Sequence, residues 1–148
     1  MKILALTAMG ISMAASGATA QELRPAPGYF VDAMVSITTA ENIATACPNL
    51  TFNAVAASDA TAEVMEKLAA DGFDAENLEG TMADPGDAVR GKQATFREKH
   101  KLAKDETDFI RVCMAGFAEI KESTQVGSFL AEITGEGAVD PTKDGQGG

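Results

Sequence analysis

The chain holds two cysteines, Cys47 and Cys113, whose sulfur chemistry could serve redox exchange, metal binding or a structural disulfide. A redox or haem-attachment site would need a Cys-x-x-Cys unit, and these cysteines lie far apart along the chain. Pairing is the default in an oxidising compartment, where closing so long a loop would stabilise the fold by about 4 kcal/mol. The sequence therefore predicts a structural Cys47–Cys113 disulfide, with two unpaired buried thiols as the alternative.

The only histidine of the chain, His100, is the natural candidate for a general base. It lies between Lys99 and Lys101 on a predicted surface helix, and no serine stands in a Gly-x-Ser-x-Gly elbow. A catalytic triad needs a base oriented beside a nucleophile, and the sequence shows no such pattern. We therefore expect a solvated His100 and name no catalytic residue.

Two patterns in the sequence imitate metal sites. Asp140, Thr142, Asp144 and Gly145 resemble the first half of a calcium loop, but no glutamate stands at position twelve, so an acidic tail is the simpler interpretation. The methionines beyond residue 20 are scattered, which favours core packing over copper binding. They are Met34, Met65, Met82 and Met114. We expect no metal site and no cofactor.

Charge is distributed unevenly along this acidic chain, whose net charge is −10. Overall repulsion argues against nucleic acid and anionic lipid as partners. Positions 59–84 hold eight acidic residues against Lys67 alone, whereas positions 90–104 hold six basic residues against Glu98 alone. The basic helix either lies near the acidic segment, or forms an exposed patch for a protein or ligand that carries negative charge. Its basic residues are Arg90, Lys92, Arg97, Lys99, Lys101 and Lys104.

Residues 1–20 read as a cleavable secretory signal. Lys2 precedes a short apolar run, and Ala18-Thr19-Ala20 gives a small-x-small cleavage site. The run is too short to span a bilayer, and no later apolar stretch is long enough, so we expect no membrane span. The sequence predicts a periplasmic or secreted protein, with one helical domain over residues 21–134 and a disordered, acidic, Gly-rich tail over 135–148.

Helical periodicity and stop signals divide the domain into elements. A first helix is expected over 28–46 and is ended by Pro48. Its predicted buried face comprises Phe30, Met34, Ile37, Ala40, Ala44 and Cys47. A second helix, with Asn49 or Thr51 as its cap, should end at Gly72 with Phe73 folded back onto it.

Three further segments complete the expected bundle. Asp74 should cap a short segment over 75–82, and Asp84 with Pro85 should begin a helix over 85–103. The last helix should follow Asp105 or Thr107. The cost of Gly116 and Gly127 within it could be offset by close helix approach, or by a kink or a break near Ser123-Thr124. No alternating strand pattern is visible, so the predicted fold is an all-α bundle of four or five helices with one disulfide.

The segment Cys113-Met-Ala-Gly116-Phe-Ala-Glu119-Ile120-Lys-Glu-Ser123-Thr-Gln125-Val-Gly127 resembles the C-terminal signature of a domain-of-unknown-function family. The members of that family are small, exported alphaproteobacterial proteins with a cysteine pair. The resemblance implies an all-helical exported domain and the cysteine pair, and it implies no activity. Its polar positions make Glu119 and Gln125 candidate interaction residues. We expect Glu119 to pair with Lys121 or Arg111 or to be solvated, and Gln125 to cap or bridge helices.

These observations favour a non-enzymatic binding or protein-interaction domain, whose candidate residues are the basic segment 90–104 with Glu119 and Gln125. A carboxylate-dependent hydrolase or cell-wall-modifying enzyme is one alternative, because paired carboxylates meet in space rather than in sequence. A carrier of a small apolar ligand, held in the bundle core, is another.

Overall fold

The computed structural model describes residues 22–134, so the predicted signal segment and the predicted tail lie outside the described residues. The predicted all-α bundle is confirmed, with the addition of one small sheet. The elements in chain order are α1 (Gly28–Ala46), β1 (Leu50–Phe52), α2 (Ala54–Ala70), α3 (Leu78–Thr81), α4 (Gly86–His100), α5 (Phe109–Lys121), α6 (Gln125–Ser128) and β2 (Leu130–Glu132).

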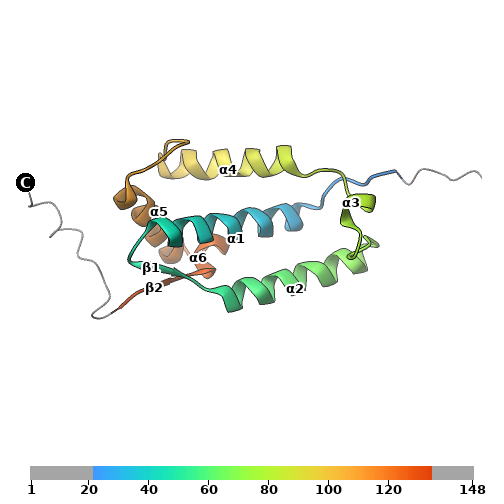
Figure 1. Ribbon diagram of the computed structural model, residues 1–148, viewed down its shortest axis with the longest axis horizontal. Coiled ribbons are helices and arrows are strands. Elements are labelled where there is room, and N and C mark those ends of the chain that lie inside the picture. The colour runs from blue at the N-terminus through green and yellow to red at the C-terminus, as the bar shows by residue number, and fades with distance from the viewer. Residues whose placement is uncertain (1–21, 135–148) are drawn as a thin grey trace, which may run out of the picture.

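Helix α1 is the central element of the bundle and lies between α4 and α2 (Figure 1). Its bounds are those predicted from the sequence, but its buried face is different: Met34 is exposed, while Val31, Val35 and Ile43 are buried. The prediction assumed one apolar face, whereas α1 is also contacted by α5, α6 and β1. A helix surrounded on several sides buries more than a single stripe.

The disulfide between Cys47 and Cys113 is confirmed, with a Cα–Cα distance of 5.1 Å. It joins the end of α1 to the middle of α5, and both cysteines are buried in the main apolar cluster. Ile43, Leu50 and Phe129 are further members of that cluster. The cross-link therefore lies within the core that α1, α5 and the small sheet share.

The two strands, β1 and β2, correct the prediction that no strand is present. They pair antiparallel, with Leu50 opposite Glu132 and Phe52 opposite Leu130. Residues 50–52 were expected to begin the second helix, but Asn53 caps α2 instead, by accepting a hydrogen bond from the N–H of Ala56 at 3.1 Å. Strands of three residues are too short to show alternation, and their partner is remote in sequence.

The C-terminus of α2 follows the predicted turn. Gly72 adopts a left-handed conformation with φ of +79°, and the N–H of Phe73 donates to the carbonyl of Leu68 at 2.9 Å. The N–H of Gly72 donates to the carbonyl of Ala69, which completes a Schellman motif. Phe73 is buried against Leu68 in a second apolar cluster at this end of the bundle.

Several caps differ from the predicted ones by a few residues. Asn77 rather than Asp74 caps the short helix α3, and Asp108 rather than Asp105 or Thr107 caps α5. Helix α4 begins one residue later than predicted, with Pro85 rather than Asp84 at the cap position, although Asp84 still accepts a hydrogen bond from the N–H of Gly86 at 2.9 Å. In each case several Asp or Asn side chains stand near the helix start, and the sequence alone does not choose among them.

A break near Ser123-Thr124, one of the alternatives that the sequence left open, is present between α5 and α6. Ser123 adopts a positive φ of 53°, and Thr124 caps α6 by accepting from the N–H of Gly127. A Cβ at position 127 would lie 2.2 Å from the backbone oxygen of Glu119, so only glycine permits this approach. Glycine at position 127 lowers the helix propensity of α6, but it allows the chain to turn back closely against the backbone of Glu119.

None of the helices in residues 22–134 is long and apolar enough to cross a membrane.

Alanine at position 127 should destabilise the fold by about 2 kcal/mol or more, because the backbone that it meets cannot move aside as a side chain can. Urea unfolding monitored by circular dichroism measures the change. Gly91→Ala is the matched control, since a Cβ there meets nothing within 4 Å and should stabilise α4 by about 0.5–1 kcal/mol. Equal stability of Gly127→Ala and the wild type would contradict the required close approach.

Candidate functional site

A buried carboxylate, that of Glu119, connects α4 with α5 and the start of α6. Only 3% of Glu119 is exposed. One of its oxygens, Oε1, lies 2.7 Å from Lys99 Nζ and 2.6 Å from His100 Nε2. The other oxygen accepts a hydrogen bond from the hydroxyl of Thr124. The expected pairing with Lys121 or Arg111, or solvation, is therefore wrong: the partners come from α4 and from the turn after α5.

Burial raises the pKa of Glu119, but the hydrogen bonds from Lys99, Thr124 and His100 outweigh this effect and hold the pKa below its usual value. Hydrogen bonds to Glu119 and Glu122 in turn raise the pKa of Lys99. The carboxylate is thus ionised at neutral pH and can only accept hydrogen bonds, which assigns the donating hydrogen to Nε2 of His100.

His100 is nearly buried, with 9% of its side chain exposed, and its ring lies 4.7 Å from that of Phe96 between ring centroids. The expectation of a solvated histidine is therefore wrong. Triad chemistry would need a nucleophile beside this ring, and no serine or cysteine in residues 22–134 hydrogen-bonds to it. What the arrangement does is to anchor the end of α4 to α5.

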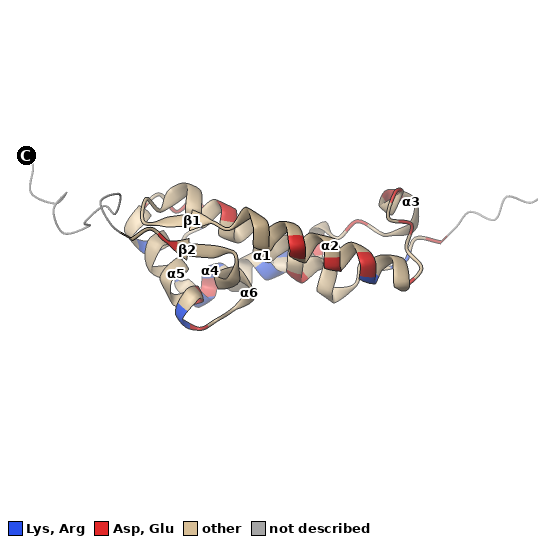
Figure 2. Cartoon of the chain, turned by 90° about the horizontal axis from the view of Figure 1, so that it is seen from below, with Lys and Arg blue, Asp and Glu red and all other residues tan. Residues whose placement is uncertain are grey.

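The basic residues of segment 90–104 fall into two groups. Three of them, Arg90, Lys92 and Lys99, form ion pairs within the molecule. Their partners are Asp87, Asp32, Glu119 and Glu122. None of these acids belongs to positions 59–84; most of that segment lies on α2 and around α3, where Figure 2 shows acidic residues. The basic helix is thus partly paired internally, but with other acids than those expected.

The other three basic residues, Arg97, Lys101 and Lys104, form no ion pair within the described part of the chain. Lys101 ends α4 in a left-handed conformation with φ of 54°. Arg97 and Lys104 line one pocket of about 280 Å³, bounded by α1, α4, the turn over 101–108 and α5. The structure therefore gathers two of the predicted interaction residues and separates them from Lys99, which faces Glu119.

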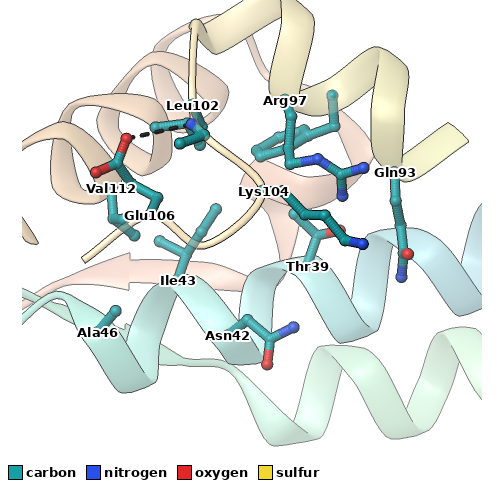
Figure 3. A pocket seen from close by; sticks show the side chains of 12 residues that line it. Thr39, Asn42, Ile43, Ala46, Gln93, Arg97, Leu102, Lys104, Glu106 and Val112 are labelled. Carbon is teal, nitrogen blue, oxygen red and sulfur yellow. Dashed lines mark hydrogen bonds between the residues drawn. The ribbon is translucent and has the colours of Figure 1, made fainter. Parts of the chain in front are cut away.

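The pocket has an apolar floor and a polar rim. Ile43, Phe96, Leu102 and Val112 supply apolar lining. Figure 3 shows the side chains of Arg97 and Lys104 entering the space between α4 and α1. Three neutral polar side chains lie beside them, and these were not foreseen from the sequence because their spacing shows no pattern; they are Thr39, Asn42 and Gln93.

Glu106 also lines the pocket, but its carboxylate is used to hold the turn. It accepts hydrogen bonds from the backbone N–H groups of Asp108 at 3.1 Å and Ala103 at 3.3 Å, and these bonds lower its pKa. Arg111 approaches it at 3.5 Å and also donates to the carbonyl of Lys101. The turn that carries Lys104 is therefore fixed, and Glu106 is not the counter-charge of Arg97 or Lys104.

Gln125 has the bridging role expected of it. Its amide oxygen accepts a hydrogen bond from the hydroxyl of Ser36 at 3.1 Å, which joins α6 to α1. Among the described residues, no group of three or more His, Cys, Asp or Glu side chains could hold a metal ion.

A protein-family model described as a family of unknown function (DUF5333) matches residues 22–131. That range contains both cysteines, the Glu119 cluster and every residue that lines the pocket. No curated protein and no solved structure matches the chain.

Replacing Glu119 by glutamine should destabilise the protein at pH 7 by about 2–4 kcal/mol, because Lys99 and His100 lose a charged acceptor; the half-exposed Lys99 keeps the loss below that of a fully buried pair. The depressed pKa of Glu119 gives stability that is present above about pH 4.3 and is lost as the pH falls through its folded value. Urea unfolding between pH 7 and pH 3 should therefore show a smaller acid loss in Glu119→Gln than in the wild type.

Glu66→Gln, on the exposed side of α2, is the control and should follow the wild-type curve. Parallel acid losses in the wild type and Glu119→Gln would show that the buried carboxylate does not carry this pH dependence.

Proposed function

The chain belongs to the family of unknown function DUF5333, and from its structure we propose that it is an exported, non-enzymatic binding domain that holds a small organic anion in the pocket lined by Arg97 and Lys104. The single observation that carries the proposal is the pairing of charges in α4. Arg90, Lys92 and Lys99 have carboxylate partners, whereas the two cations in the pocket have none among residues 22–134.

Arg97 and Lys104 outnumber the one carboxylate that lines the pocket, that of Glu106, whose oxygens already accept hydrogen bonds within the turn, so a bound anion would gain from both cations. A guanidinium binds a carboxylate or phosphate through paired hydrogen bonds, and an ammonium adds a point charge. Partial burial strengthens both interactions, because the effective dielectric constant is lower than in bulk water. Arg97 and Lys104 therefore favour a ligand with one concentrated negative group.

The remaining lining restricts the rest of the ligand. A volume of about 280 Å³ is just below the range of about 300–1,000 Å³ that is typical of ligand sites. Ile43, Phe96 and Val112 offer apolar contact, and the amides of Asn42 and Gln93 can donate or accept hydrogen bonds. We therefore propose a small carboxylate or phosphate with a compact apolar body, rather than a polymer.

Export is proposed on separate grounds. Residues 1–20 have the pattern of a secretory signal, and a buried disulfide needs an oxidising compartment to form and persist. Both features support a periplasmic or secreted protein, with residues 21–134 acting as one domain ahead of an acidic tail. The alphaproteobacterial origin is proposed only from the family resemblance. The disulfide is compatible with that location.

Replacing both pocket cations, as Arg97→Gln with Lys104→Gln, should weaken anion binding at least ten-fold, since each charge-assisted hydrogen bond contributes about 1.5–3 kcal/mol. Benzoate, hexanoate and inorganic phosphate are titrated into protein purified from the periplasm, and NMR shifts report the affinity and the place of binding. We expect shifts at Arg97, Lys104 and the turn over 101–108.

Arg90→Gln with Lys121→Gln is the matched control, because both side chains lie outside the pocket and the loss of net charge is the same. Lys99 is unsuitable as a test residue, since its removal would leave Glu119 without its ammonium partner. If none of the three anions binds, or if the pocket variant binds them as tightly as the control, the proposed function is wrong.

A further inference from the structure

A second cavity lies at the other end of α1, and its chemistry is the opposite of that of the Arg97 pocket. It has a volume of about 560 Å³ and lies between α1, α3 and the residues that precede each of α1 and α4. Its apolar walls, here called the methionine groove, are Leu23, Phe30, Met34, Leu78 and Met82. In a chain with so acidic a surface, an open apolar hollow of this kind indicates a contact site.

Backbone hydrogen bonds fix one wall of the groove. The N–H of Arg24 donates to the carbonyl of Thr81 at 3.1 Å, and the N–H of Ala83 donates to the carbonyl of Arg24 at 2.8 Å. These bonds fix the segment before α1 beside α3, and they leave Leu23 at the rim with 48% of its surface exposed. On the opposite wall, Met34 of α1 is 40% exposed, although it lies in a helix that is otherwise well buried.

The rim of the groove is acidic. Glu79 and Asp84 line it, and no basic residue among positions 22–134 does. Two arginines lie near this end of the bundle, and both have other partners. The guanidinium of Arg24 stacks over the ring of Phe73 at 4.0 Å and donates to the carbonyl of Asp71. Arg90, whose guanidinium lies beside Gly86, pairs with Asp87. Figure 2 shows further acidic positions around α3, so the potential at this end is negative.

We propose that the methionine groove binds a basic amphipathic helix of a partner protein, with apolar side chains in the groove and Lys or Arg against Glu79 and Asp84. Helices that bind in grooves present anchors at three- and four-residue spacing. The exposed side chain of Met34 can adapt to anchors of different shape, whereas Met82 is only 6% exposed and belongs to the second apolar cluster. The charge at the rim selects for basic flanking residues, because like charges there would repel. This site is independent of the Arg97 pocket and does not rest on the anion proposal.

The charges of this chain argue against two other occupants. A second copy carries the same net charge of −10 and would bring acid against acid. The segment 135–148 contains Glu136, Asp140 and Asp144 against Lys143 alone, so its charge is also of the wrong sign.

The test uses protein purified from the periplasm and two labelled peptides of sixteen residues, one of Leu and Lys in an amphipathic helical pattern and one with Glu in place of Lys. Fluorescence anisotropy should show binding of the Lys peptide and none of the Glu peptide. Leu23→Gln with Met34→Gln should weaken the Lys peptide at least ten-fold. Glu79→Gln with Asp84→Asn should weaken it several-fold and reduce its dependence on salt, and Asn keeps an acceptor for the N–H of Gly86.

Two control variants distinguish binding in the groove from non-specific binding to exposed apolar or acidic residues. Val55→Gln removes an exposed apolar side chain on α2, 72% exposed, and Asp59→Asn with Glu66→Gln removes two acids there. Both should leave the affinity for the Lys peptide unchanged. Equal binding of the two peptides, or equal losses in the groove and control variants, would overturn the proposal. So would a dimer in sedimentation analysis that Met34→Gln dissociates, because the occupant would then be a second copy.

Discussion

The carboxylate of Glu119 is the interaction on which the second half of the molecule depends. Only 3% of Glu119 is exposed, and a buried ionised carboxylate is stable only when hydrogen-bond donors replace the water that it has lost. Here Lys99, His100 and Thr124 supply those donors. Because these donors come from α4 and from the turn after α5, the charge can be satisfied in only one relative position of the two helices. The residue also acts through its backbone, since its carbonyl accepts from the N–H of Thr124 at 3.1 Å and lies against Gly127. After this turn, α6 leads into β2, which pairs with β1. The buried Glu119 therefore helps to fix the path of the chain from α4 to its last strand.

The same constraint explains why the basic run of α4 is not a uniform surface. Residues two apart on a helix do not face the same way, so Lys99 can reach Glu119 only if Arg97 faces elsewhere. The disulfide fixes α5 on its other side. Cys113 lies on α5, the helix that carries Glu119, and its bond to Cys47 ties α5 to the end of α1. With α5 bound to α1 through sulfur and to α4 through a carboxylate, the space between α1 and α4 has fixed walls, and Arg97 with Lys104 lies in that space. Two structural features that carry no reactivity of their own therefore create the pocket.

The sequence predicted those features that depend on neighbouring residues, such as helix ends. It did not predict features that depend on contacts between segments far apart in the chain. Pro48 gives the end of α1, Gly72 and Phe73 give the end of α2, and the break before Gln125 follows from its neighbours. The disulfide was predictable because two cysteines allow one pairing.

By contrast, β1 and β2 have three residues each, and nothing in either triplet indicates the other. His100 and Glu119 were expected at the surface, because nothing in the sequence shows that two polar residues on different helices bury each other. Half of the candidate basic residues were likewise neutralised by acids that only the fold brings near.

The electrostatics of the two cavities indicate different modes of recognition. The charged groups of the two cavities lie far apart: Gly86, which follows the groove residues Asp84 and Pro85, and Arg97 of the pocket are about 16 Å apart along α4 at ~1.5 Å per residue, which exceeds the Debye length of about 8 Å at physiological salt. The two sites are thus largely screened from each other and can be occupied independently. The overall charge of −10 attracts a basic partner toward the groove from a distance and repels an anion approaching the pocket. Binding in the pocket must therefore depend on short-range hydrogen bonds and apolar contact, which favours a ligand small enough to touch Arg97, Lys104 and the apolar floor at once. Binding in the groove gains from long-range attraction, which favours a larger and more adaptable partner.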